Sequence, residues 1–105
     1  MAAITGTLAS NNMLLGRGAA TKQITVTATI GSSQDTITLT SATHGIRAIT
    51  GIVGAVITGG LDAAFSYLQV SFSGLVLTVD SFEQDGTAAT DFTGTTVSIT
   101  VVGTV

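Results

Sequence analysis

Alternation of apolar and polar residues runs through most of this chain and is clearest between Phe65 and Asp80. That segment, F-S-Y-L-Q-V-S-F-S-G-L-V-L-T-V-D, contains two alternating runs joined at Ser73-Gly74, a dipeptide suited to a two-residue hairpin loop. With Phe72 opposite Leu75, one face of the hairpin is wholly apolar and the other is mostly polar. A slip of one residue would mix the two faces, so the pattern predicts a β-hairpin in a sheet that is covered on one side.

A second pair of alternating runs flanks the turn-like segment 31–34, G-S-S-Q. Its apolar positions are Ile24, Val26, Ala28 and Ile30 before the break, and Ile37 and Leu39 after it. Pairing Ala28 with Ile37 also puts Val26 opposite Leu39 and gathers the threonines on the other face. The pattern therefore predicts a second hairpin with a four-residue loop.

The other regular segments extend this β pattern. Residues 41–45, S-A-T-H-G, indicate a turn. The segment 46–60 is ambiguous, because an amphipathic helix is conceivable. Its β-branched residues and the glycines at 51 and 54 favour a long strand that is bent or bulged near one of these glycines. A last strand is predicted at Thr95–Val102, with Val97, Ile99 and Val101 on one face.

Together these elements predict an all-β fold, an antiparallel β-sandwich of about six to eight strands, jelly-roll-like or immunoglobulin-like. We expect a single domain over residues 23–105, since a chain of 105 residues can build one core but not two. The expected core consists of Val26, Ile37, Leu39, Leu68, Val70, Phe72, Leu75, Leu77, Val79, Val97 and Ile99.

Residues 1–22 are predicted to form an irregular N-terminal arm, although a short strand at Ala3–Leu8 is possible. The apolar triplet Met13-Leu14-Leu15 lies between two asparagines and the segment Gly16-Arg17-Gly18. The sandwich has enough apolar residues for its own core, so we expect Met13, Leu14 and Leu15 to dock on a neighbouring subunit, with Arg17 at the rim of that contact. The segment 16–18 lacks the further glycine of a dinucleotide fingerprint and the Lys-Ser/Thr of a P-loop.

The composition is ordinary in its hydrophobic share, 45%, but charged residues make up only 9%, against about 25% in typical domains. A net charge of −3 argues against a nucleic-acid partner, and the chain has neither cysteine nor proline. A surface so poor in charge and proline leaves strand edges open to association, although a neutral, threonine-rich monomer is the simpler alternative. No signal peptide is recognisable, and no apolar stretch is long enough to span a bilayer.

Candidate catalytic or binding chemistry is sparse. His44 is the one histidine, and no nucleophile-elbow motif accompanies it, so we interpret it as a turn residue and expect no catalysis. Asp80, Glu83 and Asp85 lie close together in sequence and could ligate calcium, but their spacing does not match an EF-hand loop, and a solvated acidic loop is the alternative. No tryptophan and one tyrosine weaken a carbohydrate site. We therefore expect no cofactor and no metal.

The chain resembles the small β-rich virion proteins of tailed bacteriophages. The resemblance lies in four features: a short N-terminus of cytosolic type, the N-terminal arm, the low-charge Thr- and Gly-rich strands, and the closing segment D-G-T-A-A-T-D-F-T-G-T-T-V-S-I-T-V-V-G. Head decoration, or cement, proteins of this kind form β-sandwich or jelly-roll-like domains on the capsid lattice, often as trimers, and clamp neighbouring capsomers.

This resemblance implies a non-enzymatic capsid decoration subunit, a homo-oligomer with a trimer favoured, whose partners are the major capsid protein or other virion subunits. It further implies synthesis in the host cytoplasm and a place in the virion, with no nucleic-acid or membrane partner. Two alternatives remain open: a tail- or fibre-associated virion subunit, and a small carbohydrate- or calcium-binding β module.

Overall fold

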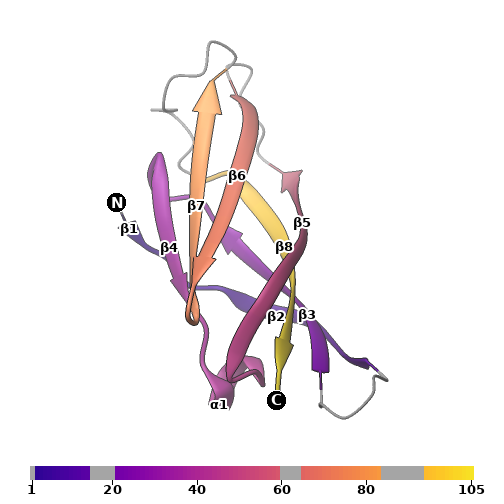
Figure 1. Cartoon of the computed structure of the whole chain (residues 1–105). Coiled ribbons are helices and arrows are strands. Elements are labelled where there is room, and N and C mark those ends of the chain that lie inside the picture. Colours follow the sequence, from indigo (N-terminus) through magenta and orange to yellow (C-terminus); the bar gives the residue numbers. More distant parts are fainter. Residues whose placement is uncertain (1, 15–20, 60–64, 84–93) are drawn as a thin grey trace.

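Two four-stranded sheets pack against each other around one core in the computed structural model, which describes residues 2–14, 21–59, 65–83 and 94–105 (Figure 1). Sheet A has the order β1-β4-β7-β6, with β1 Ala2–Ala3, β4 Gln34–Thr38, β7 Val76–Glu83 and β6 Phe65–Ser73. Sheet B has the order β2-β3-β8-β5, with β2 Thr7–Leu14, β3 Thr21–Thr29, β8 Thr96–Thr104 and β5 Ala48–Gly59. Neighbouring strands are antiparallel except β1 and β4. The predicted all-β antiparallel sandwich is confirmed.

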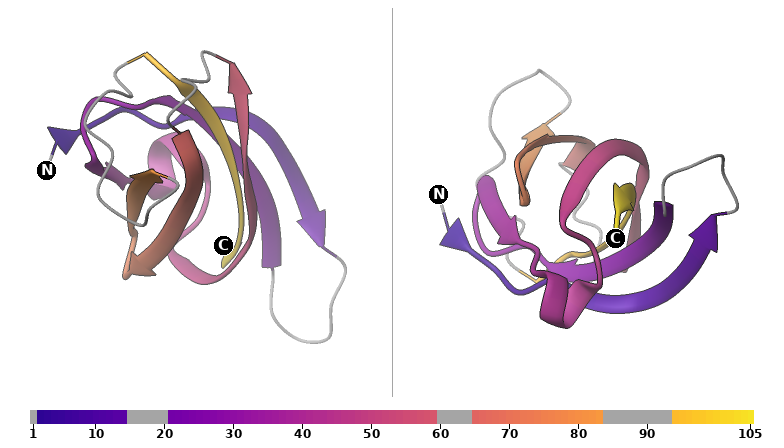
Figure 2. Two further views of the ribbon diagram at one scale, coloured as in Figure 1. Left: turned by 90° about the horizontal axis from the view of Figure 1, so that it is seen from above. Right: turned by 60° about the horizontal axis from the view of Figure 1, so that its bottom comes forward.

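The core lies between the sheets, which curve around it when the molecule is seen from above (Figure 2). Alternation builds it, because every second residue is buried in β8 and, from Ile24 onward, in β3. The buried apolar residues are Ile24, Val26, Ala28, Ile30, Ile37, Leu39, Ile46, Ile49, Leu77, Val79, Val97, Ile99 and Val101. Seven of the predicted core residues are among them, whereas Leu68, Val70 and Leu75 are half-buried and Phe72 is 40% exposed.

Strand β8 is central to sheet B. Its nine residues pair with β3 from Thr21↔Thr104 to Thr29↔Thr96 without a shift in register. On its other side β8 pairs with β5, and this ladder shifts three times, between Ile49 and Gly51, Ile52 and Gly54, and Ile57 and Gly59. The sequence-based preference for a strand bulged near Gly51 or Gly54 is thus confirmed, and no helix forms there.

The predicted hairpin between the runs around Ala28 and Ile37 is wrong. Strand β3 lies in sheet B and β4 in sheet A, so the chain crosses from one sheet to the other between them. The residues predicted to pair side by side instead face the shared core from opposite sheets, with Val26 and Ile37 both fully buried. Alternation alone cannot separate these two arrangements, because both bury the same set of side chains.

The β6–β7 hairpin is confirmed, but its register is displaced by two residues. Phe72 pairs with Leu77 and Val70 with Val79, and the two loop residues are Gly74 and Leu75. Gly74 has a φ of 60°, so glycine occupies the first loop position, as a type II′ turn requires. A displacement of two residues keeps every side chain on its predicted face, which is why the pattern did not reveal it.

The N-terminal arm, predicted to be irregular apart from a possible short strand at Ala3–Leu8, instead forms strands over residues 2–3 and 7–14. Strand β1 pairs with β4, and β2 pairs with β3 from Thr7↔Thr27 to Leu14↔Thr21. Between them the chain passes from sheet A to sheet B, where the Ile4 N–H donates to the Thr36 carbonyl at 2.9 Å. Backbone pairing needs no particular side chains, so a weakly patterned segment completes the edge of β3.

Candidate functional site

His44 is buried at the end of a short helix and is bonded to backbone groups. It ends α1 (Ser41–His44), a single helical turn capped by the Thr40 hydroxyl and by Gly45 at a φ of 80°. The imidazole is buried, its Nδ1 accepts from the Thr40 N–H at 3.0 Å, and its Nε2 lies 2.7 Å from the Gly6 carbonyl oxygen. Because a carbonyl oxygen only accepts, Nε2 carries the proton and both ring nitrogens are engaged by backbone. His44 therefore fastens α1 to the segment between β1 and β2.

An open groove of about 390 Å³ runs beside this histidine. Its lining is mostly hydroxyl-bearing: Ala3, Ile4, Thr5, Gly6, Thr36, Thr38, Thr40, Thr43 and His44. Since both nitrogens of His44 are bonded to backbone, the groove offers no free base to activate a threonine hydroxyl.

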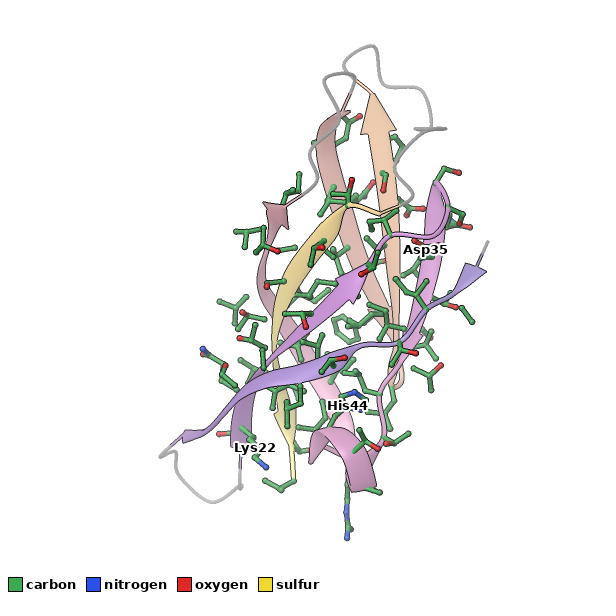
Figure 3. The ribbon with its side chains drawn as sticks, turned by 180° about the vertical axis from the view of Figure 1, so that it is seen from behind. Lys22, Asp35 and His44 are labelled. Carbon is green, nitrogen blue, oxygen red and sulfur yellow. The ribbon has the colours of Figure 1, made fainter. Side chains whose placement is uncertain are left out.

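Asp35 is a buried carboxylate that sequence reasoning missed. Its Oδ2 accepts from the Gly31 N–H at 2.9 Å, and its Oδ1 lies 2.7 Å from the Ser32 hydroxyl. These bonds close the crossing from β3 to β4, and the signal for them was an aspartate just after the turn segment G-S-S-Q. Asp35 and His44 lie far apart in the fold (Figure 3), so they do not form an acid–histidine pair.

The proposed calcium ligands are only partly within the described residues. Asp80 lies in β7, where its Oδ1 accepts from Gln34 Nε2 at 2.7 Å. The side chain of Glu83 and the whole of Asp85 lie outside the described residues. Within the described part of the chain, no three His, Cys, Asp or Glu side chains gather to hold a metal ion.

One aromatic pair lies on the outer face of sheet A beside Asp80. Tyr67 and Phe82 are cross-strand neighbours whose rings stack with centroids 4.9 Å apart and planes inclined by 17°. Each ring covers one face of the other, which leaves less of a flat platform for a sugar ring. The pair is well explained as a cross-strand contact that stabilises the β6–β7 ladder.

The outer face of sheet B is chemically uniform along its two central strands. Over the bounds of β2, β3, β5 and β8 there is one charged residue, Lys22, and it shares the inward register of Ile24. The outward positions of the two central strands are Thr21, Gln23, Thr25, Thr27 and Thr29 on β3, and Thr96, Ser98, Thr100, Val102 and Thr104 on β8. Thr25 and Thr100 join their hydroxyls at 2.9 Å across the strands. We call these ten residues the threonine face.

Strand β5 borders the threonine face with a different surface. Gly51, Gly54 and Gly59 take outward register positions opposite Val102, Thr100 and Thr96. Between them stand Val53 and Val56, exposed to 61% and 60%. We call these five residues the glycine–valine strip.

The three bulges of β5 are not equivalent. At two of them the extra residue is a threonine, and Thr50 and Thr58 donate to the Val102 and Thr96 carbonyls at 3.1 and 3.2 Å. At the third bulge the extra residue is Val53, which has no hydroxyl to donate and exposes its methyl groups instead.

The residues predicted to form a partner interface are Met13, Leu14, Leu15 and Arg17. Met13 and Leu14 lie in β2, where their backbones pair with Lys22 and Thr21. Their side chains, and the whole of Leu15 and Arg17, lie outside the described residues, so their predicted docking stays a prediction. The structure instead draws attention to β5 and to Tyr67 and Phe72 of β6, whose exposed apolar side chains the sequence analysis did not single out as a surface.

No protein-family model, curated protein or solved structure matches this chain. Among the described residues, no helix has both the length and the apolar character needed to cross a membrane.

Proposed function

We propose that this chain is a non-enzymatic assembly subunit that docks through the threonine face and the glycine–valine strip onto a larger particle. The particle we propose is the capsid of a tailed bacteriophage, on which the chain serves as a decoration subunit bound to the major capsid protein. The resemblance of its low-charge, Thr- and Gly-rich strands to such proteins supports the choice of particle. A tail or fibre subunit is the neighbouring alternative, and the experiment below separates the two.

The observation that carries the docking proposal is the set of glycines in β5. None of Gly51, Gly54 and Gly59 has a positive φ, and a Cβ added at any of them would meet nothing within 4 Å. Among the described residues, neither a positive φ nor close packing requires glycine at these positions. Glycine inside a strand costs about 0.5–1 kcal/mol relative to alanine. A surface that approaches the β5 backbone closely would explain that cost.

The chemistry of the surface fits a neutral protein partner. The threonine face and the strip have no charge at their outward positions, so they would neither attract nor repel a partner over long range. Val53 and Val56 offer apolar area flanked by hydroxyls, which resembles the apolar centre and polar rim of protein interfaces. A module that binds only the assembled lattice stabilises it by mass action, by about 2.7 kcal/mol when its free concentration is 100 times Kd.

The test is co-sedimentation with empty shells of the phage that encodes the chain, compared with unassembled capsid protein and with isolated tails. We expect the protein to sediment with shells and not with unassembled subunits or tails. The variant Val53→Thr/Val56→Thr preserves side-chain shape and should weaken shell binding at least ~10-fold through lost apolar contact.

The matched control is Val105→Thr, the same change at an exposed valine outside the strip, and it should bind like the wild type. Equal binding of the double variant would contradict the docking surface. Sedimentation with tails alone would support the tail or fibre alternative. A protein that stays in the supernatant at saturating shell concentrations would refute the proposal.

A further inference from the structure

The four sheet edges differ in how well they are protected against pairing with another chain. The edge strands are β1 and β6 in sheet A, and β2 and β5 in sheet B. Strand β1 has two residues, β5 carries three bulges, and the ladder of β2 shifts after Leu8. Short length and bulges are devices that blunt an edge.

Strand β6 has one register shift, between Phe65 and Tyr67, and none of these devices from Tyr67 onward. It pairs with β7 from Tyr67 to Ser73 without a shift, and its sequence has neither charge nor proline. Within the described residues no backbone hydrogen bond reaches its outer side, and in Figure 1 it diverges from β5 toward the β6–β7 turn. In an antiparallel ladder every second residue turns its N–H and C=O to the free edge, so β6 presents a regular row of unpaired groups.

We infer that β6 pairs with β6 of a second copy of this chain, antiparallel, with Val70 on the two-fold axis, which extends sheet A into a continuous eight-stranded sheet. Val70 is the midpoint of the regular stretch Tyr67–Ser73. The inference refines the proposed assembly role by naming a self-association surface, but it does not require the capsid as the particle.

The residue pattern of β6 is self-complementary in this register. Val70 meets Val70, Phe72 meets Leu68, and Ser71 meets Gln69 of the second copy, so apolar side chains meet apolar ones on the inner face. Phe72 is 40% exposed although its register partner Leu77 is fully buried. A neighbouring strand would cover the flank of Phe72 that the chain itself leaves open.

The absence of charge is what favours a second copy over another extended partner. A strand without charged residues has no complement to offer a basic or acidic peptide, whereas like strands bring no like charges together. The low net charge of −3 also leaves little repulsion between whole copies. A two-fold contact is isologous and closes as a dimer, in contrast to the trimer that the resemblance to decoration proteins implies.

Disulfide trapping tests the register directly, because the chain has no cysteine of its own. In Val70→Cys the only two thiols of a dimer would face each other at a separation that a disulfide spans. We expect mild oxidation to yield a covalent dimer of Val70→Cys, and no more than background from Thr38→Cys, an exposed position on β4. Equal cross-linking of the two variants would overturn the inference.

Charge exchange provides the second measurement and leaves the core untouched, since Gln69 and Ser71 are both exposed. In Gln69→Lys/Ser71→Lys each new lysine faces another across the axis, and dimerisation measured by analytical ultracentrifugation should weaken at least ~10-fold. Mixing it with Gln69→Glu/Ser71→Glu should restore a dimer containing one copy of each. Thr38→Lys/Ala42→Lys adds the same charge at exposed positions elsewhere and should dimerise like the wild type.

A wild type that stays monomeric, or that sediments as a trimer, refutes the β6 pairing whether or not the protein binds shells. If the wild type is a dimer, the lysine variant of β6 is not, and neither binds shells, the pairing is supported and only the capsid role is refuted. The two proposals therefore fail separately.

Discussion

Strands β3 and β5 flank the same central strand, β8, and both pair with it antiparallel, but the β3 ladder is regular whereas the β5 ladder is interrupted by bulges. Strand β3 follows β8 through nine consecutive residue pairs, whereas β5 needs twelve residues to form nine pairs and shifts three times. The outward positions of β3 hold threonines and one glutamine, whereas those of β5 include three glycines and an exposed valine. The inward positions are apolar in both strands apart from Lys22 of β3, but those of β5 are less completely buried.

The difference separates two kinds of constraint on a sequence. From Ile24 onward the sequence of β3 is explained by the fold of the chain itself: β-branched residues suit a pleated sheet, and the alternate residues Ile24, Val26 and Ala28 fill the core. Strand β5 departs from those needs at Gly51, Gly54 and Gly59, where neither conformation nor space requires glycine. Local conflict with the fold is expected at functional or strained sites, and among the strands of sheet B it is concentrated in β5.

The largest expected effect comes from a residue that both strands depend on. Ile99 of β8 is fully buried and lies in register with Val26 of β3 and Ala55 of β5. Ile99→Ala should lower the free energy of unfolding by about 2–5 kcal/mol, from lost burial and the cavity left behind. Urea denaturation measures it, with Ser98→Ala on the opposite face as the control, expected within about 0.5 kcal/mol of the wild type. A similar loss in both variants would contradict the assignment of the two faces.

An intermediate effect is expected where β3 leaves its sheet. Asp35→Ala removes the side-chain acceptor of the Gly31 N–H and one of the two acceptors of the Ser32 hydroxyl, which also lies 2.6 Å from the Gln34 carbonyl oxygen, and this should cost about 1–3 kcal/mol of stability. Asp35→Asn keeps the shape and one oxygen acceptor, so thermal unfolding should rank it between the wild type and the alanine variant. If both the alanine and the asparagine variants were as stable as the wild type, the crossing between the sheets would not depend on this carboxylate.

The same contrast explains which features of the fold could be predicted from sequence. Alternation predicts strands and faces, because the two-residue period alone decides which side chains point inward, as Val97, Ile99 and Val101 show. It does not specify partners: β3 and β4 bury the same residues in a hairpin or in opposite sheets, and the β6–β7 register can move by two without changing a face. Those choices depend on Asp35 and on the positive φ of Gly74, which are local details without periodicity.

The candidate surface was hard to predict for a related reason. The glycines near 51 and 54 suggested a bent strand, which is correct, but sequence cannot tell whether a glycine is required by its own chain. Only the space around each position separates Gly54, where a Cβ meets nothing, from Gly103, where it would meet the Ala48 carbonyl. The arm residues Met13 to Arg17 drew attention because an apolar triplet is conspicuous in sequence, whereas Val53 and Val56 resemble ordinary strand residues.

Gly54 and Gly103 provide the last prediction, which concerns the smallest expected effect. Gly54→Ala should stabilise the isolated protein by about 0.5–1 kcal/mol, because alanine loses less conformational freedom on folding and its methyl group enters open space. The same variant should bind shells more weakly if a partner surface approaches the β5 backbone. Gly103→Ala is the matched control on β8, where the added Cβ would collide with the Ala48 carbonyl and come within 3.0 Å of Ile46 Cδ1, so this variant should be destabilised instead. Thermal unfolding and shell binding of both variants complete the comparison: a Gly54→Ala protein that is more stable and binds as well as the wild type would mean that the glycines of β5 serve neither the fold nor this partner.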